Sequence, residues 1–193
     1  TINQLYLQMN KDVFKTIIIE GQEELQEVEL YQRSFAFEEQ GRYVDYVVIM
    51  GYDEHTSSSE TTGSVASIGF VEQGIIDTLE MVEAAKIING VPFYSRGWST
   101  KDGEISVQTL TMGGQEQFIS NHGIYVEWDE QTAQYYGENT VDGVFYQIWV
   151  EDDESLQRKL DVMTKYDIAG VAQWKLGIET SDVWQNISNY MNP

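Results

Sequence analysis

Short runs of apolar and β-branched residues alternate along the chain with longer amphipathic segments. The apolar runs predict buried strands over Val13–Glu20, Tyr46–Tyr52, Lys86–Phe93 and Ile168–Trp174. The amphipathic segments predict helices over the latter part of Gln22–Gln40 and over Ser67–Val82, Asp152–Tyr166 and Ser181–Met191. Because the predicted strands and helices alternate, we expect an α/β fold with a parallel sheet covered by helices.

Residues 99–150 interrupt this alternation. They are predicted to hold a short helix and three strands joined by turns, namely Met112–Asn121, Ile124–Trp128, Ala133–Glu138 and Val144–Val150. We interpret 99–150 as an α+β subdomain inserted into one domain that covers residues 1–193. Eight βα units would close a TIM barrel. The four units predicted here therefore indicate a partial, open barrel.

The central strand ends in a cluster of hydrogen-bonding side chains, Gly51-Tyr52-Asp53-Glu54-His55. In α/β proteins, ligands bind at the C-terminal ends of buried parallel strands. Strand alternation places Met50 and Tyr52 on one face, and Asp53 follows where the strand ends. An aromatic hydroxyl beside a carboxylate suits the recognition of a polyol or an amide. The alternative is an ordinary strand followed by a polar loop.

Two other predicted strands also end in polar and aromatic residues. The strand over Lys86–Phe93 is followed by Tyr94-Ser95-Arg96-Gly97-Trp98. In the last strand, Gly170, Ala172 and Trp174 share a face, so small side chains leave room for the indole to lie across the strand ends.

Charge and composition narrow the class of partner. The chain has 32 acidic and 11 basic residues, a net charge of −21, which argues against nucleic acid or an anionic membrane as partner. It has no cysteine, and its two distant histidines and scattered acids do not have the spacing of metal ligands, so we expect no metal, with calcium at the acidic run Glu151–Glu154 as a remote alternative. We also expect no cofactor. No apolar run approaches 20 residues. Thr1 is not a natural first residue, which leaves open a targeting segment that has been removed.

Three motifs resemble those of one family. Met50-Gly51-Tyr52-Asp53 resembles a Met-x-Tyr-Asp motif, and the segments GVPFYSRGW at 90–98 and GVAQW at 170–174 resemble the two strand segments that follow it. The family is glycoside hydrolase family 18, the chitinase-like TIM barrels, which includes bacterial spore-cortex and cell-wall hydrolases. The resemblance runs from about Tyr31 to Tyr190 and implies the C-terminal half of the barrel, about strands 5–8. Many members carry an α+β insertion at the same place.

The resemblance also implies a chemistry, the substrate-assisted hydrolysis of N-acetylglucosamine-containing glycans such as chitin or peptidoglycan. As catalytic residues, Tyr52 would bind the acetamido group and Asp53 would hold sugar hydroxyls or support the acid. The substrate-binding residues would be Met50, Glu54, Tyr94, Arg96, Trp98 and Trp174. The implied location is secreted, or associated with the cell wall or spore of a bacterium.

Alternatives to these roles remain for several of the residues. Tyr52 and Asp53 could instead brace the rim of the sheet, and Trp174 could be a core residue. Arg96 could equally neutralise nearby carboxylates. For Glu54 and His55, a hydrogen bond at the rim is favoured over a role as an acid/base pair.

The sequence departs from the family at its general acid, the last residue of Asp-x-x-Asp-x-Asp-x-Glu. That spacing occurs nowhere, and Asp102-x-Glu104 and Asp152-x-Glu154 match only its last three positions. Glu20 lies one βα unit before the Met-x-Tyr-Asp motif, whereas the family acid lies two units before it. We therefore expect little hydrolysis by this chain alone. The alternatives are a lectin-like glycan-binding module and a structural half barrel.

An open half barrel also predicts association with another chain. The strands Val13–Glu20 and Ile168–Trp174 would be exposed edges, and the apolar inner face of the sheet would be uncovered. We expect self-association or a partner that supplies the missing half, with residues 1–12 as a candidate cover for part of one edge.

Overall fold

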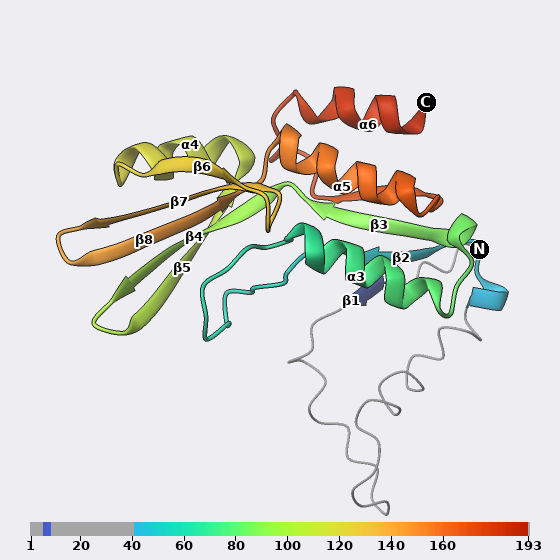
Figure 1. Cartoon of the computed structure of the whole chain (residues 1–193), viewed down its shortest axis with the longest axis horizontal. Helices are drawn as coiled ribbons and strands as arrows, with labels where there is room; N and C mark the ends of the chain where they lie inside the picture. The colour runs from blue at the N-terminus through green and yellow to red at the C-terminus, as the bar shows by residue number, and fades with distance from the viewer. Residues whose placement is uncertain (1–5, 9–40, 193) are drawn as a thin grey trace, which may run out of the picture.

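The structure is a computed structural model that describes residues 6–8 and 41–192 of the chain. Its elements are, in order, β1 (Tyr6–Gln8), β2 (Val47–Met50), α3 (Ile68–Leu79), η1 (Ala84–Lys86), β3 (Ile87–Pro92), β4 (Tyr94–Lys101), β5 (Glu104–Thr111), α4 (Met112–Asn121), β6 (Tyr125–Asp129), β7 (Gln134–Val141), β8 (Val144–Val150), α5 (Asp153–Lys165), β9 (Gly170–Trp174) and α6 (Val183–Met191). They form a parallel sheet with its helices and, beside it, a long antiparallel sheet (Figure 1).

The parallel sheet has four strands in the order β1-β2-β3-β9. Its register pairs Met50 with Gly90, Gly90 with Ala172, and Pro92 with Trp174. Because all four strands run the same way, the C-terminal ends of β2, β3 and β9 meet at one edge of the sheet. The described residues form an open sheet and no closed barrel, so the mixed α/β class is confirmed while a partial barrel stays a prediction.

One face of this sheet forms the main core with the helices. The buried apolar side chains come from strands, from α3, α5 and α6, and from the segments between them; they include Val47, Ile49, Ile87, Val91, Phe93, Val71, Ile75, Leu156, Leu160, Met163 and Val183. The opposite face carries Val48, Met50 and Ile88, which are only partly buried. This second face is the one that a complete barrel would enclose.

The second sheet is antiparallel, in the order β5-β4-β8-β7-β6. Helix α4 packs on one face through a small core of Leu110, Phe118, Ile124 and Ile148. The sequence predicted α4 and β8 with the observed bounds, and β6 and β7 with small shifts. It missed the β4–β5 hairpin, and the sheet consequently begins at Tyr94, before the expected boundary at residue 99.

The N-terminal expectations can be compared only in part. The predicted strand Val13–Glu20 and the helix within Gln22–Gln40 lie outside the described residues. The strand that pairs with β2 is Tyr6–Gln8, so on this side the edge of the described sheet is β1. Among the helices of residues 6–8 and 41–192, none has the length and apolar character needed to cross a bilayer.

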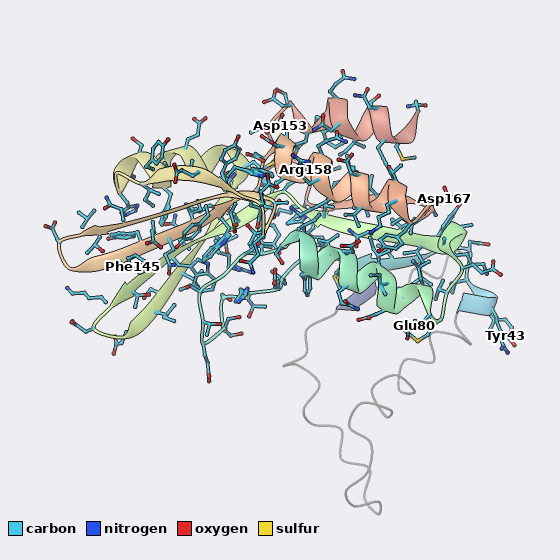
Figure 2. The ribbon with its side chains drawn as sticks, in the orientation of Figure 1. Tyr43, Glu80, Phe145, Asp153, Arg158 and Asp167 are labelled. Atoms are coloured by element: carbon cyan, nitrogen blue, oxygen red, sulfur yellow. The ribbon has the colours of Figure 1, made fainter. Side chains whose placement is uncertain are left out.

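Local signals explain where the helices begin. Asp152 caps α5 by accepting a hydrogen bond from the Ser155 N–H at 2.8 Å, and the Ser155 hydroxyl accepts from the Asp152 N–H in return. Asp153 then starts α5 and Asp167 follows its end (Figure 2). Ser67 caps α3, whereas α6 begins later than predicted, at Val183.

The packing of β7 against β6 gives a stability prediction. A Cβ on Gly137 would lie 2.5 Å from Ile124 Cγ2 and 2.6 Å from the carbonyl oxygen of Tyr125. We expect Gly137→Ala to lower the free energy of unfolding by about 1–3 kcal/mol in urea titrations, because the backbone at Tyr125 must move to make room for the added methyl group. Gly113→Ala in α4, where a Cβ would meet nothing within 4 Å, is the control and should be neutral or stabilising. Equal stability of Gly137→Ala and the wild type would contradict this packing.

Candidate functional site

The end of β2 lies against β3 because of two glycines. The Gly51 N–H donates to the Gly90 carbonyl at 3.0 Å, and a Cβ on Gly51 would lie 2.5 Å from Asn89 Oδ1. A Cβ on Gly90 would lie 3.1 Å from Tyr52 Cε1 and 3.1 Å from the Ile49 carbonyl oxygen, so a larger residue there would push the tyrosine ring away by a few tenths of an ångström. Met50 is partly buried beneath, at the position paired with Gly90.

Asp53 is held in place by two donors from β4. Its Oδ1 accepts a hydrogen bond from the Tyr94 hydroxyl at 2.6 Å and one from Arg96 Nη2 at 2.9 Å. Its backbone is left-handed, with φ 64°, a conformation that aspartate tolerates better than most residues. Both of these bonds go to Oδ1, and no hydrogen bond from the described residues reaches Oδ2.

Arg96 joins the loop after β2 to the β4–β5 hairpin. Its Nε donates to the His55 carbonyl at 3.1 Å and its Nη1 to Thr109 Oγ1 at 2.7 Å, in addition to the bond to Asp53. The residue is only 8% exposed. A planar guanidinium can make three such contacts at fixed angles, and the site depends on that geometry.

Tyr94 lies between Asp53 and the aromatic ring of Tyr52. The two tyrosine rings meet edge to face, with centroids 6.3 Å apart and planes at 73°. Burial raises the pKa of Tyr94, and the hydrogen bond to Asp53 raises it further. Tyr94 therefore stays protonated at neutral pH and acts as a hydrogen-bond donor.

Glu54 and His55 make hydrogen bonds that organise the rim. Glu54 Oε2 accepts from the Ser67 N–H at 2.8 Å, at the start of α3. His55 Nδ1 donates to the Ser64 carbonyl at 3.0 Å. Each side chain thus holds the loop that follows β2, which matches the rim role that the sequence favoured over an acid/base pair.

The structure places the two candidate tryptophans differently. Trp98 is 1% exposed and its Nε1 donates to the Gly63 carbonyl at 2.9 Å, so it packs inside the molecule and supports the loop after β2. Its role in binding substrate stays a prediction. Trp174 is 55% exposed at the end of β9, opposite Pro92 and beyond the small Ala172. Of the two, only Trp174 presents a flat surface to solvent.

Sequence reasoning missed Thr109 and the buried role of Trp98. Both depend on the β4–β5 hairpin, where Arg96 pairs with Thr109 and Trp98 with Val107. The alternation in EISVQTLT was the available signal for this strand. Among the described residues, no group of three or more His, Cys, Asp or Glu side chains could hold a metal ion.

Comparison with known proteins gives this arrangement a family context. The sequence profile of Glycosyl hydrolases family 18 matches residues 7–179. The chain is 30% identical over 152 residues to the "Uncharacterized glycosylase YvbX" of Bacillus subtilis, with 76% of this chain and 42% of that protein covered. It is 27% identical over 156 residues to a "Cortical fragment-lytic enzyme" of Bacillus anthracis, with 77% of this chain and 35% of that protein covered.

Among solved structures, the chain resembles a chitinase from Chromobacterium violaceum. The TM-score is 0.71 at 26% identity, with 81% of this chain and 49% of the chitinase covered. The chain thus spans less than half of the length of each of these relatives. Since the family profile matches most of the sequence, the chain belongs to glycosyl hydrolases family 18.

Proposed function

We propose that this chain forms one part of a family 18 barrel and holds an N-acetylglucosamine-containing glycan at the ends of β2, β3 and β9. In this proposal these are barrel strands six, seven and eight of a domain over 1–193, and 99–150 is its inserted subdomain. The carrying observation is that Asp53, fixed by Tyr94 and Arg96, lies at the same sheet edge as the exposed Trp174.

The proposed chemistry uses each of these side chains. In a substrate-assisted reaction the N-acetyl carbonyl of the sugar attacks its own anomeric carbon, while an acid protonates the leaving oxygen. Tyr52 would orient the acetamido group, and Asp53 Oδ2 would accept from the amide N–H or a sugar hydroxyl. Trp174 would stack beneath the sugar ring. Met50, Glu54, Tyr94 and Arg96 would line or support the site.

The motif that carries the general acid of the family does not occur in this sequence. Because Asp-x-x-Asp-x-Asp-x-Glu occurs nowhere in this sequence, we propose that another part of the parent protein supplies it. By itself the chain would cleave little. The same observation favours a second candidate function, a module that binds the glycan without cleaving it.

The relatives suggest where such a glycan occurs. The curated relatives include cortical fragment-lytic enzymes of Bacillus, and the solved ones include chitinases. We therefore propose peptidoglycan or chitin as the substrate class of the parent protein, and the bacterial cell wall or spore as its location. A net charge of −21 makes nucleic acid an unfavourable partner.

The proposed stacking role of Trp174 can be tested with chitotetraose. We expect Trp174→Ala to weaken binding about tenfold and to remove most of the ligand-induced fluorescence change, because the sugar loses its aromatic platform. Trp184→Phe is the matched control: Trp184 is also partly exposed, but it packs edge to face against Phe93 from α6. Calorimetric titration of both variants decides the matter, and equal losses in affinity would count against the assignment.

The second face of the parallel sheet, which the described residues leave partly exposed, predicts association. Partly exposed Ile88 and its neighbours would be buried by a second copy or by the other half of the barrel. In sedimentation velocity at micromolar concentration we expect a dimer or larger species. Ile88→Lys should shift it toward monomer, whereas Ile105→Lys, on the exposed β5, should not. A monomeric wild type would refute this part of the proposal.

A further inference from the structure

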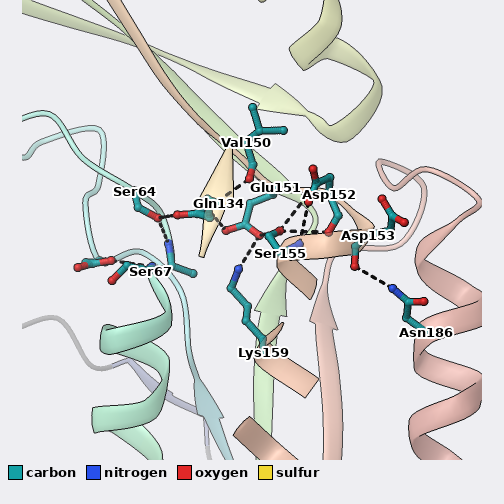
Figure 3. A network of polar contacts seen from close by, with 12 residues as sticks. Ser64, Ser67, Gln134, Val150, Glu151, Asp152, Asp153, Ser155, Lys159 and Asn186 are labelled. Carbon is teal, nitrogen blue, oxygen red and sulfur yellow. Dashed lines mark hydrogen bonds and ion pairs between the residues drawn. The ribbon is translucent and has the colours of Figure 1, made fainter. Parts of the chain in front are cut away.

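A buried glutamate lies where the two sheets and their helices meet. Glu151, directly after β8, exchanges two backbone hydrogen bonds with the Gln115 side chain of α4, both 2.8 Å long. Its Oε1 accepts from Gln134 Nε2 at 2.8 Å, and its Oε2 accepts from Lys159 Nζ at 2.9 Å and from Ser155 Oγ at 3.1 Å (Figure 3). All five residues are almost completely buried. The site described above uses none of them.

This cluster holds two charges in a low-dielectric interior. Burial raises the pKa of Glu151, while the Lys159 ammonium and the Ser155 hydroxyl act in the opposite direction. Buried ion pairs depend on further hydrogen bonds for their stability, and here the Glu151 carboxylate receives them from Gln134 and Ser155. Such a network tolerates little displacement of its members, because each displacement leaves a buried polar group without its hydrogen-bond partner.

The network continues from Gln134 into the loop after β2. Gln134 Oε1 accepts from the Ser64 hydroxyl at 2.5 Å, and the Ser64 carbonyl accepts from the backbone N–H and the Nδ1 of His55 at 3.2 and 3.0 Å. The His55 carbonyl in turn accepts from Arg96 Nε, and Arg96 binds Asp53. A series of hydrogen-bonded residues, in which Ser64 and His55 each bond through two different groups, therefore connects Lys159 in α5 to Asp53 after the end of β2.

We propose that Gln134, Glu151 and Lys159 form a positioning unit that fixes the 55–64 loop and, through it, the orientation of Arg96 and Asp53. These residues are not catalytic, because they lie inside the molecule and touch no part of the proposed ligand site. Their effect on glycan binding rests on the proposed function. Their effect on the loop does not.

A purely structural network would lower the stability of the whole chain and leave the loop no more mobile than its surroundings. The first test is therefore local hydrogen exchange in the complete chain. In Gln134→Leu, the amides of Glu54 and His55 should exchange about tenfold faster, because their loop loses its anchor. Val183→Ala, a core change in α6, is the control for lost stability and should leave these amides unchanged. An equal change in both variants would overturn the proposal.

Ser64→Ala provides a second, milder variant, which decides the matter if Gln134→Leu does not fold. Ser64→Ala removes one hydroxyl from the same series, so it should raise the exchange rates of the loop amides by a similar factor. In the double variant of Ser64→Ala and Gln134→Leu, these rates should be no higher than in the more affected single variant. Additive effects, or an unchanged loop in Ser64→Ala, would refute a common series.

Chitotetraose binding supplies the functional readout. Gln134→Leu should weaken binding by about tenfold, the loss expected when a hydrogen bond to a charged group is removed, while Val183→Ala should not. Unchanged affinity with a mobile loop would overturn the link to Asp53. If the wild type itself does not bind, the proposed function fails, and the exchange experiment still tests the positioning of the loop.

Discussion

One guanidinium joins the two sheets of this protein at the place where a ligand would bind. Arg96 belongs to the antiparallel sheet, yet its Nη2 and Nε bind Asp53 and the carbonyl of His55 in the loop that follows the parallel strand β2. The hydrogen bond between Arg96 and Asp53 joins two charged groups, and it is strong because Arg96 is almost completely shielded from water. The orientation of Asp53 therefore depends on the second sheet as much as on its own strand.

A second ion pair, Glu151–Lys159, is fully buried and stabilises the same junction between the two sheets. Lys159 and Glu151 are both buried, and Glu151 also binds α4 and β7 through Gln115 and Gln134. Charges in such a place cost free energy unless each is paired, so the elements that supply the partners must keep their relative positions. The largely buried Asp53–Arg96 pair at the site and the fully buried Glu151–Lys159 pair thus both constrain the loop that follows β2.

Sequence patterns predicted the parts of this arrangement that depend on residues close together in the sequence. Apolar runs located β2, β3 and β9, and α4 was predicted with its observed bounds. The same patterns placed Trp174 at a strand end, where the register pairs it with Pro92, whereas β2 ends at Met50, two residues before Tyr52. What was missed depends on distant residues. The alternation in β5 was a weak signal, because most of that strand is exposed, and periodicity cannot indicate the Asp53–Arg96 bond, which joins residues 43 apart.

In the proposed site Arg96 orients Asp53 for glycan binding, and calorimetric titration of chitotetraose into Arg96→Lys measures this effect. The single nitrogen of a lysine ammonium cannot reach the three acceptors that Nε, Nη1 and Nη2 of Arg96 reach, so we expect about tenfold weaker binding than in the wild type. Thr109→Val removes only the contact to Nη1 and should lower the affinity less. Equal affinity of Arg96→Lys and the wild type, or no binding by either, would contradict the account.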